Sequence, residues 1–285
     1  MHYREKAYAK LNLSFRVLKK LPNGYHSIQS LIVFIPNLHD TLLVKLSDSN
    51  NIKIGGKFAK NLLACGGDKL VYKTIKEFSN YFSRSIKLDV LLTKEIPLGA
   101  GLGGGSADAS AIARVILKIF KIKCEKKEII KLLMKIGADL PVCFYSSNLL
   151  VEGMGNRIIP FKKLNFKPWI LIITPPINIS TKLIFENFVG PFSKKKSDYY
   201  TVSKLLFDLN NFSNPLEDIV KKEFFSFAKL INSLPKLNSI CSPRMTGSGS
   251  SIFILFNTEN DAKKYLKEIN YLIKNCWSKI SQLSL

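Results

Sequence analysis

The sequence has no membrane-length apolar run, no paired-cysteine motif, and far fewer acidic than basic residues. Its strongest apolar runs, residues 31–35, 169–173 and 252–256, have the length of buried strands. The N-terminal stretch MHYREKAYAK contains no apolar signal core, and the five scattered cysteines form no C-x-x-C pattern. We therefore expect a soluble, cytoplasmic protein with no membrane partner, no disulfides and no cysteine zinc site.

The residues that are present suit a folded protein of moderate size. Of 285 residues, 46% are hydrophobic and 11% aromatic, which is too many for a disordered chain. At about 150 residues per domain, this length predicts two domains or one large one. A chain of this size buries about 70–75% of its unfolded surface, so it needs neither disulfides nor metal in order to fold.

The charge is strongly positive, with 43 Lys and Arg against 21 Asp and Glu, a formal net charge of +22. Such a field attracts nucleic acids and nucleotides alike. The lysines of residues 126–136 fit the solvent face of an amphipathic helix. The only tight basic run, residues 194–196, is followed by Tyr199 and Tyr200, which leaves open a small stacking patch for nucleic acid. Because most lysines are spread along the chain, nucleic acid is the less favoured partner.

The hydrophobic pattern predicts strands mixed with helices, with a glycine- and proline-rich boundary near residues 150–165. Expected strands cover residues 6–17, 27–35, 41–46, 52–54, 86–94, 169–174 and 252–256. Expected helices cover residues 69–82, 106–119, 126–136, 182–188, 202–208, 216–233 and 261–273.

The most informative segment is PLGAGLGGGSADAS at residues 97–110, between an expected strand and an expected helix. Glycine permits positive φ and close backbone approach, and a helix N-terminus offers free N–H groups, so this segment favours phosphate binding over a plain turn. Ser106 is either the N-cap of the helix or a hydroxyl for phosphate or metal. The segment lacks a Walker A lysine, and its G-x-G-x-x-G match lacks the βαβ context of a dinucleotide site.

This segment resembles the phosphate loop of the GHMP small-molecule kinases. AKLNL at residues 9–13 and MTGSGS at residues 245–250 are similar to the other two motifs of that family. The resemblance implies an α+β fold of two domains, the first ribosomal protein S5 domain 2-like and the second ferredoxin-like. It implies an ATP-binding domain over residues 1–155 and a substrate-binding domain over residues 156–285.

Two further motifs narrow the resemblance within the family. NGYH at residues 23–26, followed by QSL, and GADLPV at residues 137–142 are similar to a branch that phosphorylates a hydroxyl of a CDP-linked polyol in non-mevalonate isoprenoid synthesis. The implied partners are ATP and that small molecule, with the protein a monomer or a weak homodimer. The alternatives are another GHMP kinase, or a non-catalytic nucleotide- or RNA-binding module.

Two residues are candidates for catalysis. Asp139 lies in an apolar stretch, where a carboxylate is either a base or the N-cap of a helix that begins before Pro141; the local sequence does not decide between them. Lys10 alternates with apolar neighbours on a strand and could simply face solvent. The resemblance implies that Asp139 is the catalytic base and that Lys10 lies beside it, stabilising the carboxylate and a developing alkoxide.

For ATP, the resemblance implies contacts around the glycine loop. The residues expected there are Lys94, Pro97, Gly99, Gly101, Gly103, Gly104, Gly105 and Ser106. Mg²⁺ is expected with ATP, and no protein ligand for it is evident beyond Ser106 and Asp139. Lys69 and Ala107 depart from the asparagine and the serine usual in the family.

For the substrate, the resemblance implies a cytosine pocket and a loop near the substrate phosphates. The residues expected there are Asn12, Tyr25, His26, Phe185, Thr246, Gly247 and Gly249. Plain structural roles exist for most of them. Tyr25 and His26 could belong to an ordinary hairpin, Phe185 to the core, and Thr246 to a β-turn.

Overall fold

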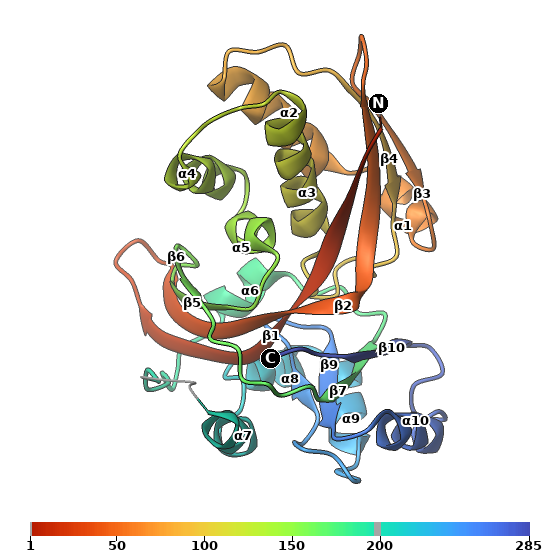
Figure 1. Cartoon of the computed structure of the whole chain (residues 1–285). Coiled ribbons are helices and arrows are strands. Elements are labelled where there is room, and N and C mark those ends of the chain that lie inside the picture. Colours follow the sequence, from red (N-terminus) through yellow and green to blue (C-terminus); the bar gives the residue numbers. More distant parts are fainter. Residues whose placement is uncertain (1, 197–200) are drawn as a thin grey trace. The chain divides into compact units, whose positions relative to one another are not determined.

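The computed structural model describes residues 2–196 and 201–285, so Tyr199 and Tyr200 lie outside the described residues (Figure 1). The chain forms two compact units. Unit 1 contains Met1–Lys10, Leu38–Leu98 and Gly103–Ser147, and unit 2 contains Leu11–Asn37, Gly99–Leu102 and Asn148–Leu285. Two long strands, β1 (Tyr3–Lys20) and β2 (His26–Leu46), contribute residues to both units.

In unit 1, strand β4 (Leu88–Thr93) lies between β3 (Asn51–Gly55), to which it is parallel, and the second half of β2, to which it is antiparallel. Helices gather on one side of these strands (Figure 1). They are α2 (Lys69–Tyr81), α3 (Gly104–Ile119), α4 (Lys126–Ile136) and α5 (Leu140–Tyr145), with the short α1 (Ala59–Ala64) beside β3. Buried side chains of these helices and strands form one hydrophobic core.

In unit 2, the first half of β2 pairs with β5 (Leu149–Gly153), and β5 pairs with β6 (Arg157–Pro160). A second, antiparallel sheet has the order β10-β7-β9-β8. Its strands are β7 (Trp169–Thr174), β8 (Arg244–Met245), β9 (Ile252–Phe256) and β10 (Trp277–Gln282).

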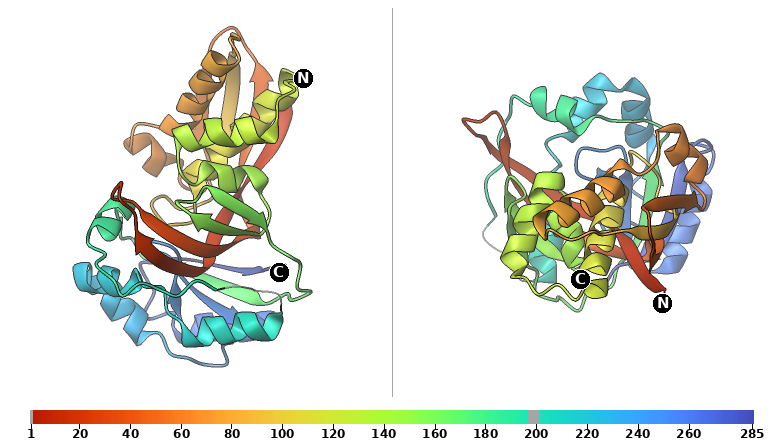
Figure 2. Two further views of the ribbon diagram at one scale, coloured as in Figure 1. Left: turned by 90° about the vertical axis from the view of Figure 1, so that its left-hand side faces the viewer. Right: turned by 90° about the horizontal axis from the view of Figure 1, so that it is seen from above.

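Alternate residues of β7 and β9 pack against helices, so one face of the second sheet forms a core. These helices are α6 (Thr181–Glu186), α8 (Glu217–Glu223), α9 (Phe225–Ser233) and α10 (Glu259–Glu268). Phe15 and Val17 of the β1–β2 hairpin join this core, and the hairpin lies beside the sheet in Figures 1 and 2. Helix α7 (Val202–Asn211) lies between α6 and α8 along the chain.

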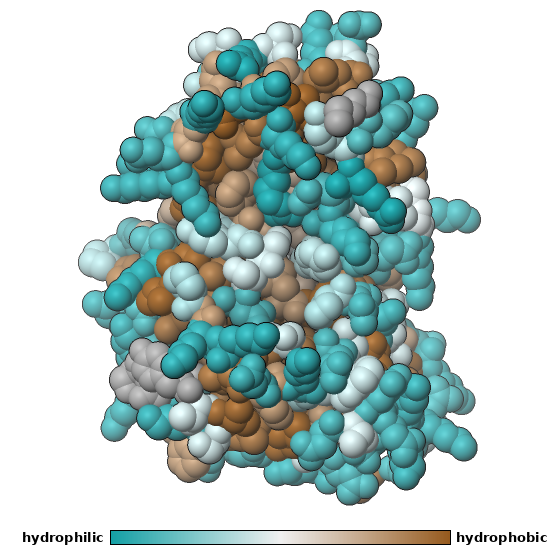
Figure 3. Space-filling model, in the orientation of Figure 1, coloured by the Kyte–Doolittle hydropathy of each residue, from teal (hydrophilic) through white to brown (hydrophobic). Residues whose placement is uncertain are grey.

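Hydrophilic side chains are spread over the whole face in Figure 3 rather than gathered in one patch. Among the described residues, no helix combines the length and apolar character needed to cross a bilayer.

The mixed helices and strands in two units confirm the α+β class, whereas several element boundaries were predicted wrongly. The strands expected at residues 27–35 and 41–46 are one strand, β2. Pro36 lies between the β5 ladder, which ends at Ile32, and the β4 ladder, which begins at Thr41. It therefore removes no hydrogen bond from either ladder.

The helix expected over residues 216–233 is two helices, because Phe224 leaves the helical region with φ −126° and ψ 88°. The helix expected over residues 261–273 instead spans Glu259–Glu268, with Thr258 as N-cap. The pattern missed α1, α5, β5, β6, β8 and β10.

Candidate active site

The glycine loop ends where α3 begins, and its backbone is left-handed at three glycines. Gly99, Gly101 and Gly103 have φ values of 63°, 72° and 69°. Gly103 is the N-cap, so Ser106 lies in the first turn, and of the two alternatives for Ser106 the N-cap is wrong. The first helical bond runs from Ala107 N to Gly103 O at 2.8 Å. The preceding N–H groups of α3 therefore have no intrahelical partner and can bind an anion.

Close packing explains why these positions are glycine. A Cβ on Gly99 would lie 2.7 Å from Oδ1 of Asn178, and one on Gly101 would strike the carbonyl of Gly249. Within unit 1, a Cβ on Gly103 would lie 2.8 Å from Cγ of Lys10. Gly103 therefore leaves space for the aliphatic stem of Lys10 at the start of α3.

Lys10 and Asp139 lie together in unit 1. Nζ of Lys10 is 3.6 Å from Oδ2 of Asp139, and the two side chains are 8% and 49% exposed. Asp139 stands at the N-cap position of α5, yet its side chain makes no capping hydrogen bond. The capping interpretation therefore loses its support, and the carboxylate is accessible beside a nearly buried ammonium group.

Substitution of Gly103 by alanine is expected to lower kcat at least tenfold. The new Cβ meets the stem of Lys10 and forces a φ of 69° on an L residue, a strain of about 1–2 kcal/mol. Steady-state kinetics measure the effect. The control is Gly55→Ala, where a Cβ meets nothing within 4 Å. Wild-type kcat in Gly103→Ala would show that Lys10 needs no clearance there.

Lys94, expected to contact the nucleotide, is 1% exposed and sits in a charge cluster. Its Nζ lies against Oδ2 of Asp40 and 2.5 Å from Oδ2 of Asp108. Burial acts to lower the pKa of Lys94, but the charges of Asp108 and Asp40 outweigh it and raise that pKa. A Cβ on Gly104 would lie 3.4 Å from the Lys94 Nζ, so the ammonium group lies directly behind the start of α3.

Asp108, in the second turn of α3, holds this cluster under the loop. Burial raises the pKa of Asp108 well above its usual value, with Lys94 opposing the shift. The same cluster includes Asp68, the N-cap of α2, whose side chain accepts from Val71 N at 2.9 Å. Burial also raises the pKa of Asp68. The cluster joins the N-termini of α2 and α3 to strands β2 and β4.

The two departures from the family pattern occupy different environments. Lys69 is exposed in the first turn of α2, whereas Ala107 is 2% exposed in the hydrophobic core of unit 1. A serine hydroxyl at Ala107 would be buried, so alanine suits the core packing of this chain. Pro97 is buried at the start of the loop.

In unit 2, His26 lies within a cage of phenylalanine rings. Its ring centroid is 5.4 Å from that of Phe185 and 5.7 Å from that of Phe188. The imidazole is 7% exposed, and among the described residues its Nε2 has no hydrogen-bond partner. Neighbouring Tyr25 is 67% exposed. Phe185 is half-buried at the edge of this cage. Of the two expected stacking residues, Tyr25 is therefore next to His26 in the sequence and Phe185 packs on its ring.

Also in unit 2, Asn12 is tied to the second predicted substrate loop. Oγ1 of Thr246 accepts from Asn12 N at 2.8 Å, and Asn12 Nδ2 donates to Oγ of Ser30 at 2.8 Å. Gly247 and Gly249 have φ values of 56° and 87°, which an L residue rarely adopts. The loop at residues 246–249 is therefore a turn with two left-handed glycines, and a hydrogen bond from Asn12 attaches it to β1.

Sequence reasoning missed the residue that holds this loop in place. Asn214, 2% exposed, donates through Nδ2 to the carbonyls of Met245 and Gly247 at 3.1 and 2.6 Å. No pattern near Asn214 indicates this role, because its partners lie more than 30 residues away along the chain. Arg244 is structural, since its guanidinium donates to Phe212 O at 2.7 Å and to Leu209 O.

The fold and the glycine loop define a GHMP kinase. GHMP kinases N terminal domain matches residues 69–147, and GHMP kinases C terminal matches residues 188–274. The chain is 33% identical to a 4-diphosphocytidyl-2-C-methyl-D-erythritol kinase of Thermodesulfovibrio yellowstonii, over 97% of this chain and 96% of that protein. It is 30% identical to the enzyme of that name in Clostridium acetobutylicum, over 93% and 94%. The chain belongs to the GHMP kinase family.

Solved structures agree on the fold. A crystal structure of 4-(cytidine 5'-diphospho)-2C-methyl-D-erythritol kinase matches with a TM-score of 0.79 and 22% identity, over 99% of this chain and 100% of that one. The homoserine kinase of Cytophaga hutchinsonii matches with a TM-score of 0.70 and 18% identity, over 100% and 95%. The family models and the curated relatives confirm the predicted family, and the protein is an ATP-dependent small-molecule kinase.

Proposed function

We propose that the chain transfers the γ-phosphoryl group of ATP to a hydroxyl of 4-diphosphocytidyl-2-C-methyl-D-erythritol, giving the 2-phosphate in non-mevalonate isoprenoid precursor synthesis. Relatives of that name share about a third of its residues over nearly its full length. The observation that carries the substrate assignment is the cage around His26, where a buried ring nitrogen has no partner among the described residues.

The chemistry of His26 suits cytosine. Among the described residues Nε2 is buried without a partner, and the Phe188 backbone beside the ring favours a proton on the other nitrogen, Nδ1. Burial and the charge of Lys20 lower the pKa of His26 below its usual 6.5, which keeps the ring neutral at pH 7. Neutral imidazole with the proton on Nδ1 has an acceptor at Nε2. This acceptor complements the exocyclic amino group of cytosine and opposes the carbonyl of uracil.

In the proposed mechanism, Asp139 accepts the proton of the attacking hydroxyl, and Lys10 stabilises the carboxylate and the developing alkoxide. The N–H groups at the start of α3, from Gly104 to Ser106, bind phosphate oxygens and stabilise charge on the transferred group. Gly99 and Gly101 shape the approach to that helix. Asn12 and the Thr246–Gly249 loop hold the substrate.

Magnesium fits the residues present, although they form no cage for it. Among the described residues, no group of three His, Cys, Asp or Glu side chains could hold a metal ion. Mg²⁺ with ATP needs only one or two protein oxygens, because phosphates and water supply the rest. Ser106 and Asp139 would supply them. When bound, the ion would neutralise charge on the phosphates.

The proposed function is tested by measuring ADP release with a panel of acceptor alcohols. Turnover should be high with the CDP-linked polyol and at least a hundredfold lower with homoserine, mevalonate or galactose. A preference for one of those alcohols would assign another GHMP activity to the chain. ADP release with any of these alcohols would identify a kinase. No ADP release with any of them would instead favour a non-catalytic nucleotide- or RNA-binding module. A cytoplasmic location and a monomeric or weakly dimeric state stay predictions.

Acidification is expected to raise the KM for the CDP-linked substrate. Below the lowered pKa of His26, Nε2 gains a proton and becomes a donor, which no longer matches the amino group of cytosine. The KM should therefore be constant above about pH 6.5 and rise as pH falls through the His26 pKa. Kinetics across pH measure this rise. The control is His26→Ala, which should have a higher KM at every pH without this rise. A KM that rises equally in both proteins would remove His26 from recognition.

A further inference from the structure

The basic run at residues 194–196, which suggested a nucleic-acid patch, is folded onto unit 2 as part of a strap. We define the pocket strap as residues 185–196, from the end of α6 to the last lysine of the run. Near its middle, Ser193 N donates to Val17 O of β1 at 2.7 Å. Next along the strap, Lys194 O accepts from the Arg16 guanidinium at 3.0 Å. The strap thus follows the β1–β2 hairpin through its backbone.

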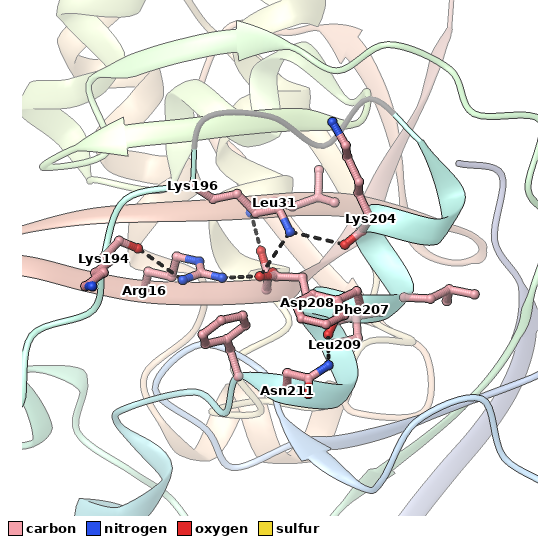
Figure 4. A network of polar contacts seen from close by, with 12 residues as sticks. Arg16, Leu31, Lys194, Lys196, Lys204, Phe207, Asp208, Leu209 and Asn211 are labelled. Atoms are coloured by element: carbon pink, nitrogen blue, oxygen red, sulfur yellow. Dashed lines mark hydrogen bonds and ion pairs between the residues drawn. The ribbon is translucent and has the colours of Figure 1, made fainter.

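The far end of the strap is fixed by a buried carboxylate. Oδ1 of Asp208, on α7, accepts from both the Arg16 guanidinium and Lys196 Nζ, the latter at 3.3 Å. The three side chains are 3%, 7% and 17% exposed. Figure 4 shows the guanidinium between the Asp208 carboxylate and the carbonyl of Lys194. Lys196 Nζ also donates to Lys204 O at 3.1 Å, so it joins the strap to α7.

A second attachment joins the strap to β2 and β5. Gln29, which is fully buried, donates from Nε2 to Lys196 O at 2.8 Å and accepts at Oε1 from Lys196 N at 2.8 Å. The Gln29 amide therefore pairs with the strap backbone as a neighbouring strand would. Gln29 Nε2 also donates to Glu152 at 3.0 Å, and Lys195 Nζ lies 3.0 Å from the other Glu152 oxygen.

The near end of the strap is the wall of the His26 cage. Phe185 and Phe188 both pack on the imidazole, and Phe192 packs on Phe188 with ring centroids 5.7 Å apart. Phe192 directly precedes Ser193, where the polar attachments begin. Movement at the lysine run would therefore reach Phe192 and, through its packing, Phe188, which lies against His26.

We propose that the pocket strap is a positioning element for the cytidine pocket, locked by Lys196 on Asp208 and Gln29 and by Lys195 on Glu152. The inference rests on the proposed function, because it assigns the strap to the substrate side of that reaction. The Lys196–Asp208 pair is largely removed from water, which strengthens it relative to an exposed pair, whereas Lys195 is 52% exposed and its pair with Glu152 contributes less. The lock keeps Phe185 and Phe188 in place before the substrate binds, which lowers the ordering cost of binding.

The same contacts argue against a polyanion patch. The ammonium groups of Lys195 and Lys196 are paired with Glu152 and Asp208, so two of the three charges in the run are already neutralised. Lys194 differs from both, because among the described residues its ammonium group pairs with no carboxylate and only its backbone carbonyl is bonded. Lys194 therefore serves as the control for substitutions of Lys196 in the same run.

The test compares Lys196→Gln with Lys194→Gln, which change the net charge equally. Lys196→Gln is expected to raise the KM for the CDP-linked substrate and the Kd for CDP about three- to tenfold, as loss of a partly buried ion pair would. Its kcat and its KM for ATP should stay within about twofold, which separates positioning from general destabilisation. Lys194→Gln should match the wild type, and Lys196→Arg, which keeps the pair with Asp208, should restore most of the affinity.

Calorimetry with CDP and the unaltered chain separates the possible failures. No CDP binding by that chain would overturn the proposed function, and with it the inference. Normal CDP binding together with equal KM values for the two glutamine variants would overturn the inference alone. A lower melting temperature in Lys196→Gln with unchanged CDP affinity would overturn it too, since the strap would then serve stability only.

Discussion

Replacing Asp139 with asparagine is expected to lower kcat by about 100- to 10,000-fold, the range in which general-base catalysis contributes. Asparagine has the same shape but cannot accept the proton of the substrate hydroxyl. Because Asp139 makes no capping hydrogen bond, the change should cost α5 little stability. The Kd for ATP should change by less than about threefold, since the phosphate-binding N–H groups of α3 come from another helix and the asparagine amide keeps an oxygen for Mg²⁺.

The matched control for this charge change is Asp89→Asn on β4. Asp89 pairs with Lys45 at 3.2 Å on the surface of the same unit, so this variant loses one carboxylate without touching the Lys10–Asp139 pair. It should keep wild-type kcat. Single-turnover phosphoryl transfer separates chemistry from product release. Full activity in Asp139→Asn would remove the base, and a loss of ATP binding would instead place Asp139 at the nucleotide.

Lys10→Met should reduce kcat too, and the double variant with Asp139→Asn should be little worse than the more damaged single variant. Two residues that act on one proton transfer are strongly non-additive. The 3.6 Å separation of Nζ and Oδ2 places them close enough for such coupling. Additive losses in this cycle would mean that Lys10 and Asp139 act on separate steps.

The sequence predicted the glycine loop well because its signal is local. Five glycines between a strand and a helix point directly to backbone that must adopt positive φ and approach a ligand. The start of α3 was misplaced by two residues, because Gly103 in the left-handed region ends the loop before Ser106, which was one possible N-cap. Local preference favoured Ser106, and the backbone conformation decided otherwise.

Other features could not be read from the sequence because their partners are distant along it. Lys94 ends an expected strand and was assigned to ATP, and nothing near it in the sequence reveals Asp40, 54 residues earlier. Strand β10 was missed because it is the edge strand of its sheet, so its exposed face is polar and its hydrophobic signal is weak. The strap likewise depends on Gln29, which is 167 residues from Lys196.

Replacing Lys94 with methionine is expected to destabilise the chain by about 3–5 kcal/mol, as removal of one partner from a buried ion pair does. Methionine fills a similar volume but leaves Asp40 and Asp108, both fully buried, without their cation. Asp40 also accepts from the backbone N–H groups of Glu95 and Ile96, so its disturbance extends to the entry of the glycine loop. A loss of this size is a large part of the about 5–15 kcal/mol that stabilises a typical domain.

Chemical denaturation measures this loss, with Lys45→Met as the control. Lys45 pairs with Asp89 while 48% exposed, so its replacement should cost less than about 1 kcal/mol. The Lys94→Met deficit should shrink as pH falls, because protonation of Asp108, whose pKa burial already raises, removes the uncompensated charge. A Lys94→Met chain as stable as Lys45→Met, with weakened ATP binding, would make Lys94 a nucleotide contact and not the centre of the buried cluster. A deficit that does not depend on pH would show that lost packing, and not the unpaired carboxylates, causes the instability.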